Sequence, residues 1–485
     1  RALKTIMAKE KETFNTSKKN NFSEWYTEII QKAELADVRY NVKGFIVFQP
    51  WSVLSMEKMF YYMESTLRKK GHLPYFFPTV IPEENFKKES SHVKGFAPEV
   101  FWLENVKGEG KLALRPTSET AFYQMFSLWI RSYKDLPFKT YQRANIFRYE
   151  TKATRPFLRS REFHWIEAHC AHASEEDAMK QVKEDMETTK EVLHDIYGLP
   201  FIFFQRPEWD KFAGAKNTFA ADVLNPDGKV VQQPSTHLLE DQFAKAFNVK
   251  FKDKDEKEKY VHITCYGPAI SRIFASVIAV HGDDKGLRFP WKIAPIQIVI
   301  VPFSQDKNVM KKTEELKKDL EKNNITIKID LTDKRPGEKF YYWEMKGVPL
   351  RIEIGKKEIK SKELIIYRRD IDKKEKIKEK DLLKYVEITS KEIDKNLTKN
   401  ADKLFENNIM GAKTKAEIKK VIGYGKIAKC MFCSITKSGE KCAEVIEKET
   451  GAQVRGIKLE KEKASGNCPI CGKKATEVVY IARSY

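Results

Sequence analysis

The sequence predicts an α+β protein built from several domains. Its 485 residues are 41% hydrophobic and 12% aromatic, which is enough to bury a sizeable core and to form two to four domains. From about residue 295 onwards, strand and helix patterns alternate, as in an α/β layer domain. Five of the seven cysteines lie in the last 56 residues and mark off a small terminal segment. The chain therefore divides into a large first domain, an α/β domain and a cysteine-bearing end.

Helices are predicted in the first domain where apolar residues recur at spacings of three and four. The strongest case is Ser52–Lys70, and Gly71 ends it. Tyr75 to Phe77 then predict a strand that stops at Pro78. Ser174 is a candidate cap for a later helix. The other helices and strand predicted in this domain are helices at 22–40, from Glu119 to 131 and at 174–197, and a strand at 111–115.

The α/β domain follows a link punctuated by proline and glycine near residues 283–295. Its apolar runs are short and bounded by turn residues, which is typical of buried strands. Strands are predicted at 296–302, 325–331, 350–354 and 363–369, and helices at 308–322 and after Pro336. The lysine-rich stretch 374–420 predicts one or two surface helices before the cysteine-bearing segment.

The stretch from Gln142 to His172 carries the densest chemistry in the chain. From Arg161 to His169, charged and aromatic residues recur at every second position, which is the period of a strand with one functional face. Cations suit phosphates or carboxylates, aromatics suit a flat ring, and carboxylates suit an amine. This pattern predicts a site for a nucleotide and a zwitterion. A salt-bridged surface hairpin is the alternative, and Phe163 and Trp165 on the charged side argue against it.

Three further polar segments accompany this hairpin: 114–120 (LRPTSET), 231–239 (VQQPSTHLL) and 265–284. The last places Arg272 among apolar neighbours on a predicted helix. A buried arginine needs an anionic partner, which is either a bound phosphate or a structural carboxylate. No Walker loop or GxGxxG motif is present, so nucleotide binding must be of another kind.

The net charge and the cysteine usage indicate the kind of partner and the cellular compartment of the protein. The formal net charge is +20, which favours a polyanionic partner, although lysine-rich composition alone gives the same sign. Clustered cysteines indicate a metal site in a reducing compartment, and we expect a cytoplasmic protein. No apolar run is long enough to span a membrane. Residues 1–19 are expected to be a leader or N-terminal extension outside the fold.

In combination and order, these segments resemble the prolyl-tRNA synthetases of the archaeal and eukaryotic type, a family of class II aminoacyl-tRNA synthetases. The segment ending in YFFP resembles the first family motif, FRYE with REF the second, and YGPAISR the third. The resemblance runs from about residue 20 to Tyr485. It implies a class II antiparallel-sheet catalytic domain (20–290), an α/β anticodon-binding domain (291–395) and a small zinc-containing C-terminal α/β domain (396–485). It also implies a homodimer, because the first motif builds the dimer interface.

The resemblance implies that proline is activated with ATP to prolyl-adenylate and then transferred to the 3′ end of tRNA(Pro). Arg148 and Arg272 would be the catalytic residues, since both would neutralise phosphate charge. Glu150 would read the adenine amino group, Phe163 would stack on the adenine, and Arg159 would hold the distal phosphates with Arg272. Mg²⁺ would bridge the phosphates. The implied ATP-binding residues are Arg148, Glu150, Arg159, Phe163, Gln232, Ser235 and Arg272.

The same resemblance implies the amino-acid pocket. Proline's secondary ammonium needs acceptors, and its ring needs an apolar wall such as Trp165. The implied proline-binding residues are Thr117, Glu119, Arg148, Trp165, Glu167, His169 and His237. About 60 residues separate the second motif from Gln232, too few for the inserted editing domain of many bacterial relatives. We therefore expect no editing in cis and a detectable activation of alanine.

Five thiols in the tail compete for the four positions of a zinc site. Paired CxxC ends favour zinc over a disulfide framework. The family pattern favours Cys433 over Cys430 as first ligand, so the expected structural set is Cys433, Cys442, Cys468 and Cys471. In the α/β domain, the candidates for anticodon contact are Lys339, Glu344, Arg351 and Glu353. The alternative is that Arg351 and Glu353 only pair with each other on the sheet.

The sequence leaves two rival functions. A threonyl or seryl enzyme is the first, but a threonyl enzyme would need a Cys/His/His metal site that segments 114–120 and 232–237 do not offer. A catalytically inactive synthetase-like binding or regulatory protein is the second. Such a protein is expected to have lost Arg148, Glu150 or Arg272, and all three are present. Cys170 and Cys265 are expected to be core or pocket-lining residues.

Overall fold

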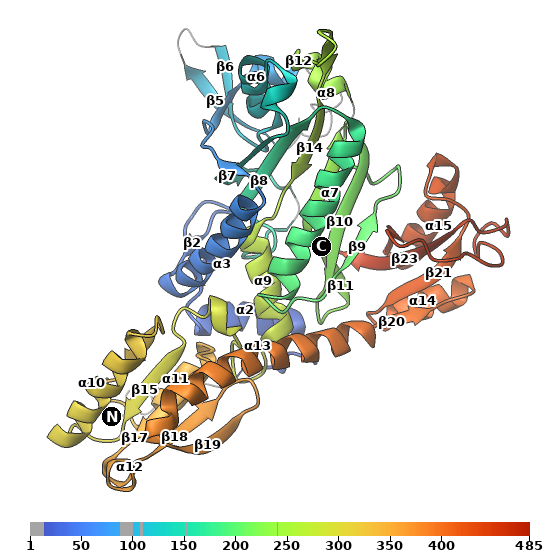
Figure 1. Ribbon diagram of the computed structural model, residues 1–485. Helices are drawn as coiled ribbons and strands as arrows, with labels where there is room; N and C mark the ends of the chain where they lie inside the picture. The colour runs from blue at the N-terminus through green and yellow to red at the C-terminus, as the bar shows by residue number, and fades with distance from the viewer. Residues whose placement is uncertain (1–13, 88–99, 107–109, 152, 240) are drawn as a thin grey trace.

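The computed structural model describes residues 14–87, 100–106, 110–151, 153–239 and 241–485. Figure 1 shows a central catalytic domain, a second domain built around β15 to β19, and a C-terminal domain around β21 and β23. The helix α13 (Leu382–Glu406) runs between the second and third domains. The predicted boundary at residue 395 falls inside this helix, so the two domains share it.

Eleven strands of the described chain form one sheet, in the order β20-β21-β23-β22-β9-β10-β11-β14-β8-β7-β3. The catalytic part of the sheet is antiparallel, except that the short edge strand β3 pairs in parallel with β7. Its strands are β3 (Leu73–Pro74), β7 (Phe138–Phe147), β8 (Glu162–His172), β9 (Ile202–Gln205), β10 (Ala215–Leu224), β11 (Lys229–Leu239) and β14 (His262–Tyr266). The remaining strands belong to the C-terminal domain: β20 (Ile409–Gly411), β21 (Ile427–Phe432), β22 (Gln453–Lys458) and β23 (Glu477–Ser484).

Helices α3, α7 and α9 cover one face of this sheet (Figure 1). Side chains such as Met59 and Phe274 pack there against Ile166 and Ala168 of β8 and form the main core. The opposite side chains of β8 are thereby left for the site. The helices of this domain are α2 (Phe22–Lys32), α3 (Pro50–Lys69), α4 (Glu83–Lys87), α6 (Glu119–Trp129), α7 (Glu175–Thr189), α8 (Asp241–Ala246) and α9 (Ile270–His281).

Short strand pairs complete the catalytic domain. One small sheet has the order β4-β6-β5 and leads into α6, whose first residue is Glu119. The short strands are β1 (Ala36–Asp37), β2 (Val47–Phe48), β4 (Val80–Pro82), β5 (Phe101–Val106), β6 (Gly110–Leu114), β12 (Lys250–Lys252) and β13 (Glu258–Tyr260).

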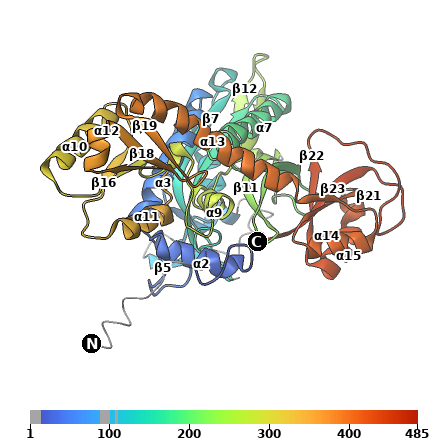
Figure 2. The same cartoon turned by 90° about the horizontal axis from the view of Figure 1, so that it is seen from below.

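The second domain has a sheet in the order β16-β15-β17-β18-β19, with β15 parallel to both of its neighbours. Apolar side chains of β15 and β17 pack against α10 and α13 in its core. Its elements are β15 (Ile298–Pro302), α10 (Lys307–Glu321), β16 (Ile327–Ile329), α11 (Pro336–Met345), β17 (Leu350–Ile354), α12 (Lys356–Ser361), β18 (Glu363–Arg368) and β19 (Lys373–Lys378). The C-terminal domain adds α14 (Lys415–Gly423) and α15 (Glu440–Thr450). Figure 2 shows these two domains on opposite sides of the catalytic core.

Four predicted elements differ from the observed ones. The helix predicted at 22–40 ends at Lys32, because the chain turns at Glu34, whose φ is +52°. The strand predicted at Tyr75–Phe77 was misplaced: β3 is Leu73–Pro74, and Phe77 N–H donates to the Gln142 side chain instead of a strand partner. The helix predicted at 174–197 continues beyond α7 as a π-helical turn at Lys190–His194. The lysine-rich stretch 374–420 also contains β19 and β20 beside its helices.

The first described residues are packed against the catalytic domain. Lys18 Nζ donates to the carbonyl oxygens of Val280 and Gly282, and its backbone N–H donates to Asp284. Residues 14–19 of the expected leader thus contact the end of α9, and residues 1–13 lie outside the described residues. Within the described ranges, no helix combines the length and apolar character that a bilayer span requires.

Candidate active site

The predicted alternation on β8 is confirmed and lines a single cavity. Phe163, Trp165, Glu167 and His169 project from one face of β8 into a cavity of about 230 Å³. The β7–β8 pairing is antiparallel and unbroken from Phe138↔Ala171 to Phe147↔Glu162, so this face is held in fixed register. The surface-hairpin alternative is excluded, since these side chains line a cavity together with residues from β10, β11 and β14.

Two arginines stand at one end of the cavity. Arg148 follows β7 and donates from Nε to the carbonyl of Pro116 at 3.1 Å. Its guanidinium lies 5.3 Å from the centre of the Phe163 ring. Arg272 comes from the first turn of α9, next to the helix N-terminus, where backbone N–H groups also favour an anion. This end of the cavity is therefore suited to phosphate and to a stacked aromatic ring.

The surroundings of Arg272 bear on whether its anionic partner is a bound phosphate or a structural carboxylate. In the described part of the chain, its guanidinium has no ion pair or hydrogen bond with a carboxylate, although Arg369 and Arg455 have several. Burial, together with the positive charges of Arg148 and Arg159, lowers the pKa of Arg272 to about 10. The three positive charges repel one another, and a bound polyanion would relieve this repulsion. The geometry thus favours a bound phosphate.

Glu150 and Arg159 are found together at the rim rather than on the cavity wall. Arg159 Nε lies 3.6 Å from Glu150 Oε2. The backbone of Glu150 is held in turn by Arg161, whose guanidinium donates to the Glu150 carbonyl. The two residues lie close enough to Arg272 for their charges to affect its pKa.

The opposite end of the cavity is acidic and closely hydrogen-bonded. Thr117 donates to Glu119, and both residues line the cavity. Glu167 accepts from Gln142 Nε2 at 2.6 Å and lies 3.3 Å from His169 Nε2. Tyr123 Oη lies 3.0 Å from His169 Nδ1, so both ring nitrogens of His169 have a hydrogen-bond partner. This network fixes a carboxylate beside the cavity.

Glu167 is held in its ionised form. Burial by itself would raise the pKa of this carboxyl group, but hydrogen bonds and charge from His169, Ser118 and Gln142 outweigh burial and lower it. A buried carboxylate with one face toward a cavity attracts a cation. Together with Glu119 it gives the cavity an acidic end, opposite Arg148 and Arg272.

His237 lies on β11 at the same level of the sheet as His169, because both residues pair with Cys265 of β14. Burial and the neighbouring charges of His169 and Arg206 lower the pKa of His237 to about 3, so the ring is neutral at physiological pH. Its two nitrogens contact Thr218 Oγ1 at 2.9 Å and Ser235 Oγ at 3.0 Å. The Phe212 ring packs against it with centroids 4.8 Å apart.

Several wall residues were missed from the sequence. Asp210, Lys211 and Phe212 lie on an irregular loop after β9, where no periodicity marks them. Thr218 sits on β10 opposite His237 and could have been found from the alternation of that strand. Gln233 was also missed; its side chain donates to Ser276 of α9 at 2.6 Å and ties β11 to the helix that carries Arg272.

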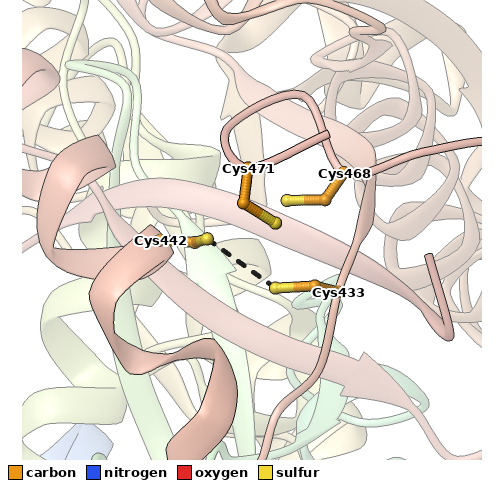
Figure 3. A group of neighbouring side chains, drawn as sticks. All are labelled: Cys433, Cys442, Cys468 and Cys471. Carbon is orange, nitrogen blue, oxygen red and sulfur yellow. Dashed lines mark hydrogen bonds between the residues drawn. The ribbon is translucent and has the colours of Figure 1, made fainter. Parts of the chain in front are cut away.

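The four expected cysteines of the tail come together, and Cys430 stays apart. The sulfur atoms of Cys433, Cys442, Cys468 and Cys471 all lie within 4.8 Å of one another. Figure 3 shows them converging on one point, with Cys433 and Cys442 at 3.7 Å. Four sulfurs around a zinc ion at about 2.3 Å would be roughly 3.8 Å apart, so this donor set fits tetrahedral zinc. Cys430 is buried in the domain core.

Three family models match successive parts of the chain. The class II tRNA synthetase core (G, H, P, S and T) matches residues 101–281, an anticodon-binding domain matches 297–388, and the prolyl-tRNA synthetase C-terminal domain matches 415–485. The proline--tRNA ligase of Thermofilum pendens is 46% identical over 97% of this chain and 98% of the relative. The chain belongs to the prolyl-tRNA synthetase family.

Other members of the prolyl-tRNA synthetase family agree in sequence and structure. The proline--tRNA ligase of Methanopyrus kandleri is 41% identical over 96% of both chains. The Giardia lamblia prolyl-tRNA synthetase in complex with prolyl-adenylate superposes with a TM-score of 0.94, at 35% identity over 98% of this chain and all of that one. The Cryptosporidium parvum enzyme complexed with L-proline and AMP gives 0.91, at 29% identity over 98% and 97%.

Three of the four anticodon candidates are paired with one another, and Lys339 has a separate partner. Arg351 pairs with Glu344 at 2.9 Å and with Glu353 at 3.1 Å, and Glu353 also pairs with Lys374. Lys339 is buried and donates to the carbonyl of Asp330. The alternative given for Arg351 and Glu353, that they pair with each other on the sheet, is therefore present. Contact of these residues with the anticodon stays a prediction.

Two further features concern the segment 173–228 and the last residue, Tyr485. In the described residues, 173–228 form α7, the following turn, β9 and β10, all within the catalytic domain, so no editing domain is inserted there. Tyr485 packs against the catalytic domain: its hydroxyl donates to Asp227, and its backbone N–H donates to the carbonyl of Val230.

Proposed function

We propose that this cavity activates proline with ATP and that the enzyme transfers the prolyl group to tRNA(Pro). The observation that carries the proposal is the division of one cavity into a cationic end and an acidic end. ATP and an amino acid must meet with the phosphate beside the carboxylate and the ammonium turned away. The two ends match that orientation.

At the cationic end, Arg148 would contact the α-phosphate and the substrate carboxylate, where charge concentrates in the transition state. Arg272 would hold the distal phosphates together with Arg159. Phe163 would stack on adenine, and Glu150 would accept from its amino group. Gln232 and Ser235 line the same cavity and complete the proposed ATP site.

At the acidic end, Glu119 and Glu167 would hold the secondary ammonium of proline, with Thr117 beside them. Trp165 would form the apolar wall for the ring. His169 would act by holding Glu167, and the neutral His237 would close the pocket without adding charge.

The chemistry needs no side-chain nucleophile. The proline carboxylate attacks the α-phosphorus of ATP and expels pyrophosphate, and the terminal ribose hydroxyl of the tRNA then attacks the prolyl carbonyl and releases AMP. Catalysis thus rests on positioning and charge neutralisation. Mg²⁺ bound to phosphate oxygens would supply further neutralisation.

The three predicted domains would divide the work. Residues 20–290 would form the adenylate, 291–395 would bind the anticodon, and 396–485 would hold zinc on the four clustered cysteines. Lys339, Glu344, Arg351 and Glu353 remain our candidates near the anticodon. The net charge of +20 supports a polyanionic partner such as tRNA. We keep the cytoplasmic placement as a prediction.

We also propose that the enzyme is a homodimer. Apolar side chains are exposed beside the first family motif: Phe76 is 89% exposed, Tyr61 60%, Leu73 58% and Leu54 49%. Such a patch is typical of an interface between protein chains. Sedimentation equilibrium should give about twice the chain mass, and a monomer at micromolar concentration would overturn this proposal.

The whole reaction is tested with tRNA. We expect the purified enzyme to charge a tRNA(Pro) transcript with labelled proline and to charge a transcript with an altered anticodon far less. Failure to charge tRNA(Pro), by protein that binds ATP and proline in calorimetry, would overturn the transfer step.

A further inference from the structure

The C-terminal domain is joined to the catalytic sheet at the strand beside the active-site wall. Strand β22 pairs antiparallel with β9, with Ile457 opposite Gln205. Gly456 makes this close approach possible, since its φ is +128° and a Cβ atom there would lie 2.1 Å from the Gln205 carbonyl oxygen. A side chain at this position would push the two domains apart.

A buried ion triad crosses the same junction. Asp222 of β10 accepts from Arg206 Nη2 at 2.6 Å and from Arg455 Nε at 2.6 Å, and each arginine makes a second contact with it. All three residues are at most 4% exposed. Although burial would raise the pKa of Asp222, the two arginines lower it to about 2, so the carboxylate is ionised. Arg455 belongs to the C-terminal domain, and the other two residues belong to the catalytic domain.

The triad reaches the cavity through Arg206. Its Nη2 donates to Gln232 Oε1 at 3.1 Å, and Gln232 lines the cavity. Its Nε has no hydrogen-bond partner among the described residues and lies 4.0 Å from the carboxylate of Asp210, another wall residue. Asp222 holds both terminal nitrogens of the Arg206 guanidinium. The triad therefore fixes how Arg206 presents Nη2 to Gln232 and Nε to Asp210.

A second junction holds the same wall. Glu208 N–H donates to the carbonyl of Ile435 at 2.9 Å, and Lys437 N–H donates to the Glu208 carboxylate at 2.8 Å. Ile435 comes two residues after Cys433. Further along the loop, Phe212 N–H donates to Thr218, which also contacts His237. The 206–212 loop is thus anchored by the C-terminal domain on one side and by the pocket on the other.

We propose that Arg455 is a positioning residue for proline activation: through Asp222 and Arg206 it orients Gln232 and the 206–212 loop for ATP. The C-terminal domain thereby sets nucleotide affinity from outside the cavity. This inference rests on the proposed function, because it assigns Gln232 to the ATP site.

The test is a double-mutant cycle between Arg455 and Gln232 in the full-length enzyme. Arg455→Met keeps the length of the side chain but removes both contacts with Asp222. We expect the KM for ATP in proline-dependent pyrophosphate exchange to rise at least about fivefold, with the KM for proline and kcat much less affected. In the Gln232→Ala background, Arg455→Met should add little, because its effect passes through Gln232.

Arg483→Met is the matched control. Arg483 lies on the neighbouring strand β23, is exposed, and donates to Thr450 within its own domain. It should leave the KM for ATP unchanged. If Arg455→Met is not recovered as folded protein, Arg455→Lys, which keeps the charge and one donor, should give a smaller rise of the same kind.

Titration with a non-hydrolysable ATP analogue separates the two possible failures. A wild-type enzyme that binds the analogue but shows no exchange would overturn the proposed function. Equal affinity of wild type and Arg455→Met for the analogue would overturn the positioning role, as would fully additive effects of Arg455→Met and Gln232→Ala.

Discussion

Arg272 and Asp185 show how single side chains acquire their roles from what surrounds them. Arg272 projects from a mostly apolar helix and lies close enough to Arg148 and Arg159 for their positive charges to lower its pKa. An arrangement of this kind is unfavourable until an anion arrives, which is why the site is prepared for triphosphate. Asp185 is instead buried between α7 and the sheet, where the side chains of Thr236 and Gln181 donate hydrogen bonds to its carboxyl group.

Replacing Arg272 tests the cationic end directly. We expect Arg272→Ala to lower kcat/KM for ATP in pyrophosphate exchange by about 10²–10³, because a preorganised charge on the phosphates is lost. The kcat/KM of Arg272→Lys should lie between those of the wild type and Arg272→Ala, since lysine keeps the charge but lacks the planar guanidinium. Exposed Arg131 offers a control, and Arg131→Ala should match wild type. An Arg272→Ala enzyme of normal activity would contradict the assignment.

Asp185 predicts a pH dependence of stability. Burial raises the pKa of this carboxyl from 3.8 to about 7, so between these values the folded state holds a proton that the unfolded state releases. The carboxyl therefore costs stability increasingly as pH rises from about 4 to 7. The free energy of unfolding of Asp185→Asn should therefore rise relative to that of the wild type between pH 4 and 7, by at most about 1.4 kcal/mol per pH unit.

Urea unfolding at pH 5, 6, 7 and 8 measures this difference. Asp177 is the control: its pKa is lowered by Ser174 and Lys180, so Asp177→Asn should give a difference that is constant over this range. A constant difference for Asp185→Asn as well would show that Asp185 does not titrate as described.

At the scale of elements, periodicity predicted most of the fold. Helical spacing or a preceding turn predicted α3, α6, α10 and α11, and alternation predicted β8. The strands β17 and β18 were predicted as short apolar runs, and every residue of β17 is buried. The errors fall where a tertiary contact overrides the local pattern. Phe77 donates to the Gln142 side chain and leaves the strand, although Tyr75-Phe76-Phe77 has strong β propensity.

The candidate site divides in the same way. Strand positions such as Trp165 and Glu167 could be predicted because alternation places them on one face. The wall residues Asp210 and Phe212 could not, since their loop has no period and is shaped by contacts with residues more than 200 positions away. The rim pair Glu150 and Arg159 came from family resemblance, and the spacing of residues alone would not have paired them.

The start of α7 gives a test at this scale. Ser174 was predicted as a cap, and its Oγ accepts from Asp177 N–H at 3.1 Å. Ser174→Ala should lower the free energy of unfolding by about 1 kcal/mol, and Ser174→Asp should restore most of it. Equal stability of all three proteins in urea would contradict this role.

At the scale of the molecule, one sheet passes from the catalytic domain into the cysteine-bearing domain, and α13 connects that domain to the anticodon-binding region. Binding of metal in one part therefore bears on the stability of the whole. We expect one zinc per chain by elemental analysis, and we expect Cys442→Ser to lose it with a lower Tm. Cys430→Ser should keep zinc, since Cys430 lies outside the cluster. Zinc retained in Cys442→Ser would contradict the ligand set.

We infer that proline is activated in a single cavity with a cationic and an acidic end. ATP–pyrophosphate exchange, run with each of the twenty amino acids, tests it most directly. We predict strong exchange with proline and weak but detectable exchange with alanine, because a pocket discriminates by only roughly 1–3 kcal/mol per methylene. Folded enzyme that shows no exchange with proline, or that prefers another amino acid, would contradict the account.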